Sequence, residues 1–262
     1  MSKPRVLVLR APGTNCDEET AFAFDQAGGK TDRLHFRRLV EDPSLLDDFQ
    51  IVCFPGGFSF GDDIAAGRIY STIIKTKLAD AFFSFRDRGG LILGICNGFQ
   101  ILLQTGLLVE PNSTGKIPAT LAFNQQGRFE ARWVHLKMTA GRCAFVAKNE
   151  IITLPIAHAE GRFLVSDPNM IGSLDADHRI VARYVDENGE PGPFPINPNG
   201  ALGDVAGVCD ESGQVFALMP HPERHISPFQ HPRWTRRRTQ PPEGDGLRLF
   251  RTAVGHFGKV LV

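Results

Sequence analysis

The sequence lacks both an excess of charge of one sign and a long apolar run. Its 262 residues include 29 Lys and Arg and 29 Asp and Glu, so the formal net charge is +0 at pH 7. A neutral chain gives no electrostatic reason to expect a nucleic-acid or anionic-membrane partner. No apolar run approaches the roughly 20 residues that span a bilayer. Residues 1–4 lead straight into a core-like strand, without the hydrophobic region of a signal peptide. We therefore expect no nucleic-acid and no membrane partner.

Cysteine is scarce and shows no paired spacing. The five cysteines are far apart, with no C-x-x-C pair, at positions 16, 53, 96, 143 and 209. An odd number of widely separated cysteines argues against a disulfide framework and against a zinc site. Reduced thiols and a cytoplasmic location fit this pattern best.

The sequence also lacks internal repeats and flexible linkers. At 42% hydrophobic and 22% charged residues its composition is that of a globular protein, and the chain is long enough to bury a substantial core. We expect a single domain over residues 1–262. Residues 186–203 and 226–245 contain clusters of proline and turn residues, and we expect them to be surface excursions from that domain.

Strand and helix patterns alternate through residue 104. The runs typical of buried parallel strands are residues 5–9, 50–54 and 91–95. A further strand is expected around residues 31–36. An apolar stripe that includes Ile74, Leu78 and Phe85 predicts one helix continuing to about residue 88. Further strands are expected at residues 129–136, 151–156, 179–185 and 204–208. We predict an α/β fold: a mostly parallel open sheet with helices on both faces and added antiparallel strands.

The most informative stretch is Gly94-Ile95-Cys96-Asn97-Gly98, between a predicted strand and a predicted helix. Small residues on both sides allow a sharp turn that presents the cysteine at the carboxyl end of the strand. The N-terminus of the following helix supplies partial positive charge and free N–H groups, which favour a thiolate and can hold an oxyanion. Cys96 is therefore a candidate nucleophile, and the alternative is a small buried hydrophobic residue.

His221-Pro222-Glu223 follows a late apolar run, at residues 214–219. The proline disfavours the helical region for His221, so the segment is expected to be extended, with residues 221 and 223 pointing the same way. A cysteine, a histidine and a carboxylate in this relation can form a thiol triad. Two alternatives stay open: a metal site made by His221, Glu223 and His225, and a hydrogen-bonded core histidine.

The loop at residues 55–58, Pro-Gly-Gly-Phe, follows another predicted strand. It lacks the G-x-x-x-x-G-K-[ST] pattern of a phosphate-binding loop. A glycine turn that exposes a backbone N–H would suit an oxyanion hole, and the second donor would be the N–H of Asn97, the residue after the nucleophile. Simple turn formation is the alternative.

Several separated motifs resemble those of the class I (triad) glutamine amidotransferases. They are residues 9–18, 55–59, 94–100, 155–163 and 219–224. Within that family the motifs look most like glutaminase subunits that serve a synthase of de novo purine biosynthesis. The resemblance implies a flavodoxin-like fold, with Cys96 as nucleophile, His221 as general base and Glu223 as the orienting carboxylate. It places the oxyanion donors on Gly57 and Asn97, and the glutamine site on Gly56, Phe58 and Gln100.

The reaction implied by the resemblance is hydrolysis of glutamine to glutamate and ammonia through a cysteine thioester. Ammonia would pass to a large synthase subunit, with a small accessory subunit in the complex, for formation of formylglycinamidine ribonucleotide. No cofactor or metal is expected in this chain, because ATP and Mg²⁺ would bind the synthase subunit. Phe60 and Asp63 depart from the family pattern, which puts details of that loop and docking contacts in question.

Two other functions are compatible with the elbow. One is a stand-alone cysteine hydrolase or stress protein, which would need no late His-Pro-Glu segment. The other is a non-catalytic scaffold that keeps the fold and binds a partner.

Overall fold

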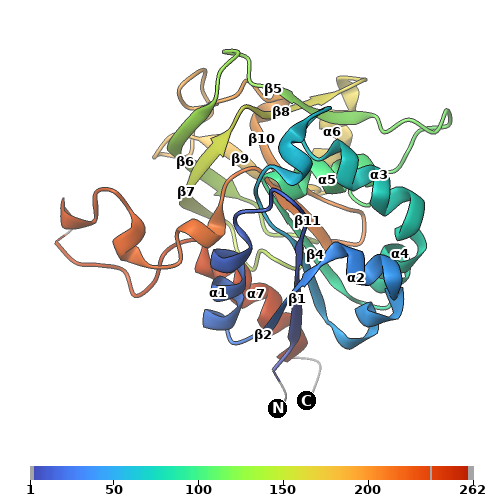
Figure 1. The fold of residues 1–262 in the computed structure, drawn as a ribbon. Coiled ribbons are helices and arrows are strands. Elements are labelled where there is room, and N and C mark those ends of the chain that lie inside the picture. The colour runs from blue at the N-terminus through green and yellow to red at the C-terminus, as the bar shows by residue number, and fades with distance from the viewer. Residues whose placement is uncertain (1–2, 237, 259–262) are drawn as a thin grey trace.

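A computed structural model describes residues 3–236 and 238–258, and its core is one large sheet (Figure 1). The described residues form a nine-stranded sheet in the order β2-β1-β3-β4-β11-β10-β9-β6-β7. Its strands are β1 (Arg5–Arg10), β2 (Lys30–His35), β3 (Ile51–Phe54), β4 (Leu91–Ile95), β6 (Glu130–Met138), β7 (Glu150–His158), β9 (Ile180–Val185), β10 (Val205–Cys209) and β11 (Val215–Leu218).

Half of this sheet is parallel. β1 pairs in parallel with β2 and β3, and β4 pairs in parallel with β3 and β11. Every residue of β3, β4 and β11 is buried, as expected where helices cover both faces of a parallel sheet. β4 is therefore an inner strand of the sheet. Cys96, the residue after it, lies at the carboxyl-terminal edge of the parallel strands.

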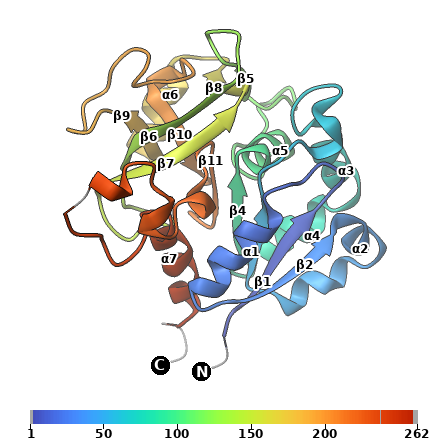
Figure 2. The ribbon, with the colours of Figure 1, turned by 60° about the vertical axis from the view of Figure 1, so that its left-hand side comes forward.

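Helices flank the parallel strands on two sides. The α-helices of the described residues are α1 (Asp17–Gln26), α2 (Phe36–Glu41), α3 (Arg68–Lys77), α4 (Ala79–Asp87), α5 (Asn97–Thr105), α6 (Asn169–Ala176) and α7 (Leu247–Gly258). α1 packs against α7 on one side (Figure 2). There the rings of Phe24 and Phe250 meet edge to face, with their centroids 4.8 Å apart. α3 packs against α5 on the other side. This arrangement follows from right-handed crossovers that leave β1 toward β2 and β3 toward β4, in opposite directions along the sheet.

The other half of the sheet is antiparallel. β10 pairs with β11 and β9, and β6 pairs with β9 and β7, all antiparallel. A separate two-stranded sheet joins β5 (Ala119–Phe123) to β8 (Glu160–Val165). The predicted fold class is confirmed, with the added antiparallel strands at residues 129–136, 151–156, 179–185 and 204–208. The pair β5 and β8 and the helix α6 were not predicted.

The single helix predicted to continue to about residue 88 is wrong. The structure has two helices, α3 and α4, which meet at Leu78, where the backbone leaves the helical region (φ −133°, ψ 3°). Ile74, Leu78, Phe82 and Phe85 are all buried. The apolar spacing continues across the break because both helices bury the same side against the sheet, so periodicity alone could not show the break.

The two stretches predicted as surface excursions differ in how they meet the core. In residues 186–203, Asn199 is fully buried and its side-chain amide donates to the carbonyl of Gly161 at 2.8 Å. Residues 226–236 carry two short 3-10 helices, Pro228–Gln230 and Trp234–Arg236. Together with residues 238–245 they extend away from the rest of the molecule, and Figure 1 shows them in orange. Among the described residues, no helix is both long and apolar enough to cross a membrane.

Candidate active site

Cys96 stands at a sharp bend between β4 and α5. Its backbone has φ 52° and ψ −104°, a conformation that residues other than glycine rarely adopt. Such backbone strain is often found at functional positions. The Cys96 N–H donates to the carbonyl of Leu218 on β11 at 2.8 Å, and its own carbonyl accepts from the N–H of Phe99 at 2.9 Å. These bonds hold the bend between the sheet and the first turn of the helix.

Gly98, two residues after Cys96 in the first turn of α5, makes this bend possible. A Cβ on Gly98 would lie 1.9 Å from the carbonyl oxygen of Phe54 on β3, so only glycine lets the helix approach the sheet this closely. A Cβ on Gly94 would lie 2.8 Å from the carbonyl oxygen of Gly98. The predicted strand, turn and helix around Cys96 are therefore present, for the steric reason that the sequence indicated.

His221 and Glu223 form a buried pair directly after β11. The Nδ1 atom of His221 lies 2.6 Å from Oε1 of Glu223, and the two residues are 2% and 0% exposed. His221 is extended (φ −103°, ψ 92°), as its position before a proline predicts. Since β11 and β4 are parallel neighbours, the segments that follow them lie at the same edge of the sheet. This places His221 near the bend at Cys96, although the two residues are far apart in the sequence.

The electrostatics of this pair suit a cysteine nucleophile. Burial acts to lower the pKa of His221, but the Glu223 carboxylate and then the charge of Cys96 outweigh it, so the pKa lies well above its ordinary value of 6.5. Nδ1 of His221 is hydrogen-bonded to Glu223, and Nε2 has no hydrogen-bond partner within the described part of the chain. The ring nitrogen that remains is the one that can exchange a proton with a thiol.

Gly57 and Asn97, the predicted oxyanion donors, both carry backbone N–H groups that donate to no backbone carbonyl among the described residues. Gly57 has φ +145°, and a Cβ there would lie 2.8 Å from the backbone of residues 13–15, so glycine is required. Asn97 is the first residue of α5, where an N–H has no partner inside the helix. Among the described residues outside regular elements, no backbone hydrogen bond uses the Gly57 N–H.

The side chains of Gln100 and Asn97 connect three segments of the chain at the site. The Gln100 amide donates to the carbonyl of Glu160 at 2.6 Å and accepts from the Asn97 amide at 2.9 Å. The Asn97 side chain also accepts from the N–H of Ser59 at 3.2 Å and donates to Asp62 at 3.4 Å. The loop after β3, the first turn of α5 and the start of β8 are thus held together around the elbow.

The other two predicted glutamine-site residues lie on the loop after β3. Phe58 is 46% exposed, so its ring reaches solvent. Gly56 packs against the candidate base, because a Cβ there would lie 2.8 Å from Cε1 of His221.

Three residues at the site were missed by sequence reasoning about chemistry. The Sγ atom of Cys96 lies 3.9 Å from the carbonyl of Ala157. Cys16, His221 and Glu223 offer ligand atoms that all lie within 4.8 Å of one another. Arg224 donates to the sulfur of Cys16 at 3.1 Å. The only available signal was that residues 16, 157 and 224 fall inside the motifs that carry the family resemblance.

The metal alternative takes a different form from the one considered on sequence. Nδ1 of His225 lies 2.6 Å from the carbonyl of Thr153, and His225 is not part of the cluster of possible ligands. Cys16, His221 and Glu223 are ligand types that zinc accepts. A metal ion bound there would take both His221 and Glu223 away from Cys96.

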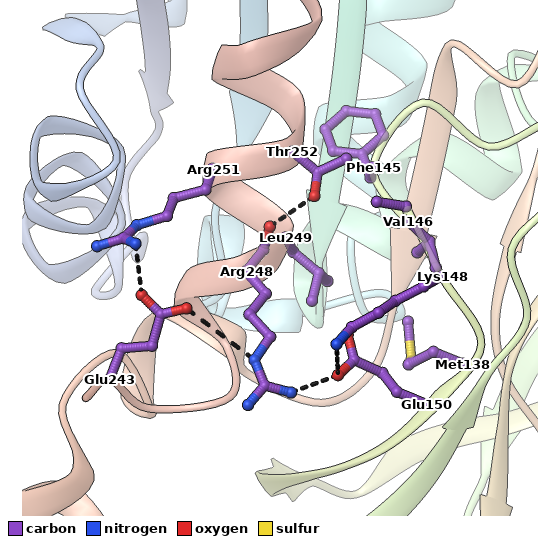
Figure 3. Close-up of a pocket in the computed structure, with 11 residues that line it drawn as sticks. Met138, Phe145, Val146, Lys148, Glu150, Glu243, Arg248, Leu249, Arg251 and Thr252 are labelled. Carbon is purple, nitrogen blue, oxygen red and sulfur yellow. Dashed lines mark hydrogen bonds and ion pairs between the residues drawn. The ribbon is translucent and has the colours of Figure 1, made fainter. Parts of the chain in front are cut away.

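A separate cavity of about 450 Å³ lies beside α7 (Figure 3). None of Cys96, His221 and Glu223 lines it. Its charged side chains bind one another: Arg251 pairs with Glu243 at 2.8 Å, and Arg248 and Lys148 both pair with Glu150. This cavity is distinct from the candidate active site.

The fold and the site define a class of protein. Residues 3–257 match the family described as the CobB/CobQ-like glutamine amidotransferase domain, and the chain belongs to that family. The glutaminase domain of Trypanosoma brucei CTPS with bound acivicin shares the fold, with a TM-score of 0.58 at 14% identity over 98% of this chain and 94% of that one.

Closer relatives narrow the class. The chain is 47% identical to the phosphoribosylformylglycinamidine synthase subunit PurQ of Dehalococcoides mccartyi, over 97% of this chain and 98% of that one. It is 40% identical to the subunit of the same name from Methanococcus maripaludis, over 98% of each. A chain in the solved structure of PurLQS from Thermotoga maritima has a TM-score of 0.75 at 32% identity, covering 98% of this chain and 100% of that one. Within the glutamine amidotransferases, the chain belongs to this family of PurQ subunits.

Proposed function

We propose that this chain is the glutaminase subunit of a phosphoribosylformylglycinamidine synthase. It hydrolyses glutamine to glutamate and ammonia and delivers ammonia to a synthase subunit, which forms formylglycinamidine ribonucleotide in de novo purine biosynthesis. The observation that carries this proposal is the elbow after β4, where Cys96 interacts with His221 of a buried His221–Glu223 pair that follows the neighbouring strand β11. The identity of 47% to a PurQ subunit over nearly the whole chain supports the same function.

The chemistry begins at the sulfur of Cys96. Glu223 holds Nδ1 of His221, which directs Nε2 to the thiol and stabilises the imidazolium that forms when the thiol loses its proton. The thiolate attacks the side-chain carbonyl carbon of glutamine, and the oxygen that gains negative charge is held by the N–H groups of Gly57 and Asn97.

The intermediate then collapses with loss of ammonia. His221 gives its proton to the departing nitrogen as the C–N bond breaks, which leaves a γ-glutamyl thioester on Cys96. Water attacks this thioester while His221 accepts a proton from the water. The C–S bond then breaks, His221 returns the proton to the sulfur, glutamate leaves, and the thiol of Cys96 is restored.

Gly56, Phe58 and Gln100 are the residues proposed to line the glutamine site. The Gln100 amide uses one N–H for the carbonyl of Glu160 and one lone pair for Asn97. A primary amide has a second N–H and a second lone pair, so Gln100 keeps one donor and one acceptor for substrate.

The partners are proposed from the relatives. A large synthase subunit and a small accessory subunit complete the complex, and ATP and Mg²⁺ bind the synthase subunit, so this chain carries neither a cofactor nor a metal of its own. The proposed location is the cytoplasm, which is supported by five free cysteines.

The test uses the complex reconstituted with its synthase subunits. Cys96→Ser is expected to abolish glutamine-dependent synthesis and to leave ammonia-dependent synthesis intact, whereas Cys143→Ser, at a buried cysteine beside Cys209, keeps both. A diazo-ketone glutamine analogue is expected to label Cys96, as mapped by mass spectrometry. Loss of both activities in Cys96→Ser would contradict the division of labour. Robust turnover of small amides by the isolated chain would favour a stand-alone hydrolase instead.

A further inference from the structure

We propose that Cys16 is a positioning residue for catalysis, whose thiol ties the N-terminal loop to the His221–Glu223 pair through Arg224. This inference rests on the proposed glutaminase function, in which the orientation of His221 toward Cys96 controls the rate. It gives a role to the motif at residues 9–18, which the chemistry above leaves unused.

The N-terminal loop, residues 11–16, holds the loop that carries the oxyanion donor. The N–H of Phe58 donates to the carbonyl of Gly13 at 2.9 Å, and the N–H of Phe60 donates to the carbonyl of Pro12 at 2.7 Å. The N–H of Cys16 donates to the carbonyl of Gly56 at 3.2 Å. Gly57 therefore lies in a segment fixed from both sides by this loop.

The side chain of Cys16 extends the same connection to the base. Its thiol donates to Oδ1 of Asn15 at 3.1 Å and accepts from the Arg224 guanidinium at 3.1 Å. Cys16 is 1% exposed, and burial raises the pKa of its thiol, which keeps it protonated and able to donate. The sulfur also lies within 4.8 Å of a ring nitrogen of His221 and a carboxylate oxygen of Glu223.

Cys16 and His221 both pack against Gly56. A Cβ at Gly56 would lie 3.1 Å from Sγ of Cys16 and 2.8 Å from Cε1 of His221, so the sulfur and the imidazole lie side by side over the same glycine. Removing the sulfur opens space beside the imidazole, into which the ring can turn.

Arg224 transmits the position of the thiol to the carboxylate. Its guanidinium pairs with Glu19 at 3.3 Å and lies 4.0 Å from Oε1 of Glu223, the oxygen that binds His221. Hydrogen bonds link Asn15 to Cys16 and Cys16 to Arg224. The ion pair of Arg224 with Glu223 extends this polar chain to the carboxylate that binds the base His221. Cys16 and Glu223 are buried members of this chain, and each contact restricts the next group, which is how supporting contacts orient a catalytic group.

The experiment measures glutamine hydrolysis by the reconstituted complex and the pH dependence of Cys96 alkylation by iodoacetamide, mapped by peptide. Cys16→Ala is expected to lower kcat about 10- to 100-fold, with KM changed by less than about twofold, because misplacement of a base slows chemistry more than binding. The pH midpoint of Cys96 alkylation is expected to shift. Cys16→Ser, whose hydroxyl can donate to Asn15 and accept from Arg224, is expected to recover kcat to within about threefold of the wild type.

Controls separate positioning from packing and from the function itself. Cys143→Ala removes another buried thiol, 4% exposed, and is expected to change neither kcat nor the alkylation profile. Arg224→Gln, at a side chain 37% exposed, interrupts the same chain from the surface and is expected to reproduce the shift even where Cys16→Ala folds poorly.

Wild-type kcat and an unchanged alkylation profile in Cys16→Ala overturn the role of Cys16. So does Cys16→Ser that is as slow as Cys16→Ala, or Arg224→Gln with an unshifted profile. A wild-type complex that fails to hydrolyse glutamine refutes the proposed function instead, so the two failures are distinct.

Discussion

His158 is expected to make the protein less stable at acidic pH. Its Nδ1 lies 3.1 Å from Oδ1 of Asn124, which also accepts from the N–H of Gly161 at 3.2 Å, so Nδ1 carries the proton of a neutral ring. Its Nε2 has no hydrogen-bond partner among the described residues. Burial lowers the pKa of His158 from 6.5 to about 3, and the charge of His221 acts in the same direction.

The magnitude follows from proton linkage. The unfolded chain binds a proton at this histidine below about pH 6.5, whereas the folded chain does so only near pH 3, so the stability present above pH 6.5 is lost as pH falls. Integrating between pH 7 and pH 5 gives a loss of about 2 kcal/mol in the free energy of unfolding from this residue alone.

The assay is urea unfolding, followed by tryptophan fluorescence, at pH 7, 6 and 5. His158→Asn keeps an N–H donor near the place of Nδ1 but does not titrate, so its loss of stability between pH 7 and pH 5 is expected to be about 2 kcal/mol smaller than in the wild type. His178→Asn is the matched control, because His178 is exposed and its φ of +55° is tolerated by asparagine. Equal losses in His158→Asn and in the wild type would refute the reasoning.

Two substitutions test the elbow and the pair behind it. Glu223→Gln replaces a fully buried carboxylate 2.6 Å from Nδ1 of His221 and is expected to lower kcat about 10²- to 10⁴-fold with little change in KM; unchanged steady-state kinetics would contradict the triad. Gly98→Ala would place a Cβ 1.9 Å from the carbonyl of Phe54, so we expect a lower melting temperature and loss of glutamine hydrolysis. Gly255→Ala is its control, because a Cβ there meets nothing within 4 Å, and it is expected to stabilise α7 by up to about 1 kcal/mol. Equal melting temperatures for the two glycine variants would show that the close approach at Gly98 has been misjudged.

Local patterns predicted much of the fold and the candidate site. Apolar runs identified β1, β3, β4 and β11, since a strand buried on both faces has to be continuously apolar. The edge strand β2 is largely polar and partly exposed. The glycines around Cys96 predicted the bend, and Pro222 predicted that His221 is extended. These features depend on neighbours in the sequence, so they could be read without knowing the fold.

Features that depend on distant neighbours could not be read in this way. The break at Leu78 left the apolar stripe intact, and β5 pairs with β8 across a long stretch of intervening chain. Cys16 gained its contacts with Arg224 and His221 only because the N-terminal loop folds over the segment after β3. The low pKa of His158 arises from burial that no local pattern indicated.

The sequence by itself determined which residues could do the chemistry and how the chain bends at each of them, because backbone preferences of glycine and proline act within a few residues. Only the tertiary structure decided that these residues meet. The pairing of β4 with β11 brings Cys96 and His221 to one edge of the sheet. That pairing is a long-range contact, favoured by burial of the whole core rather than by any single motif.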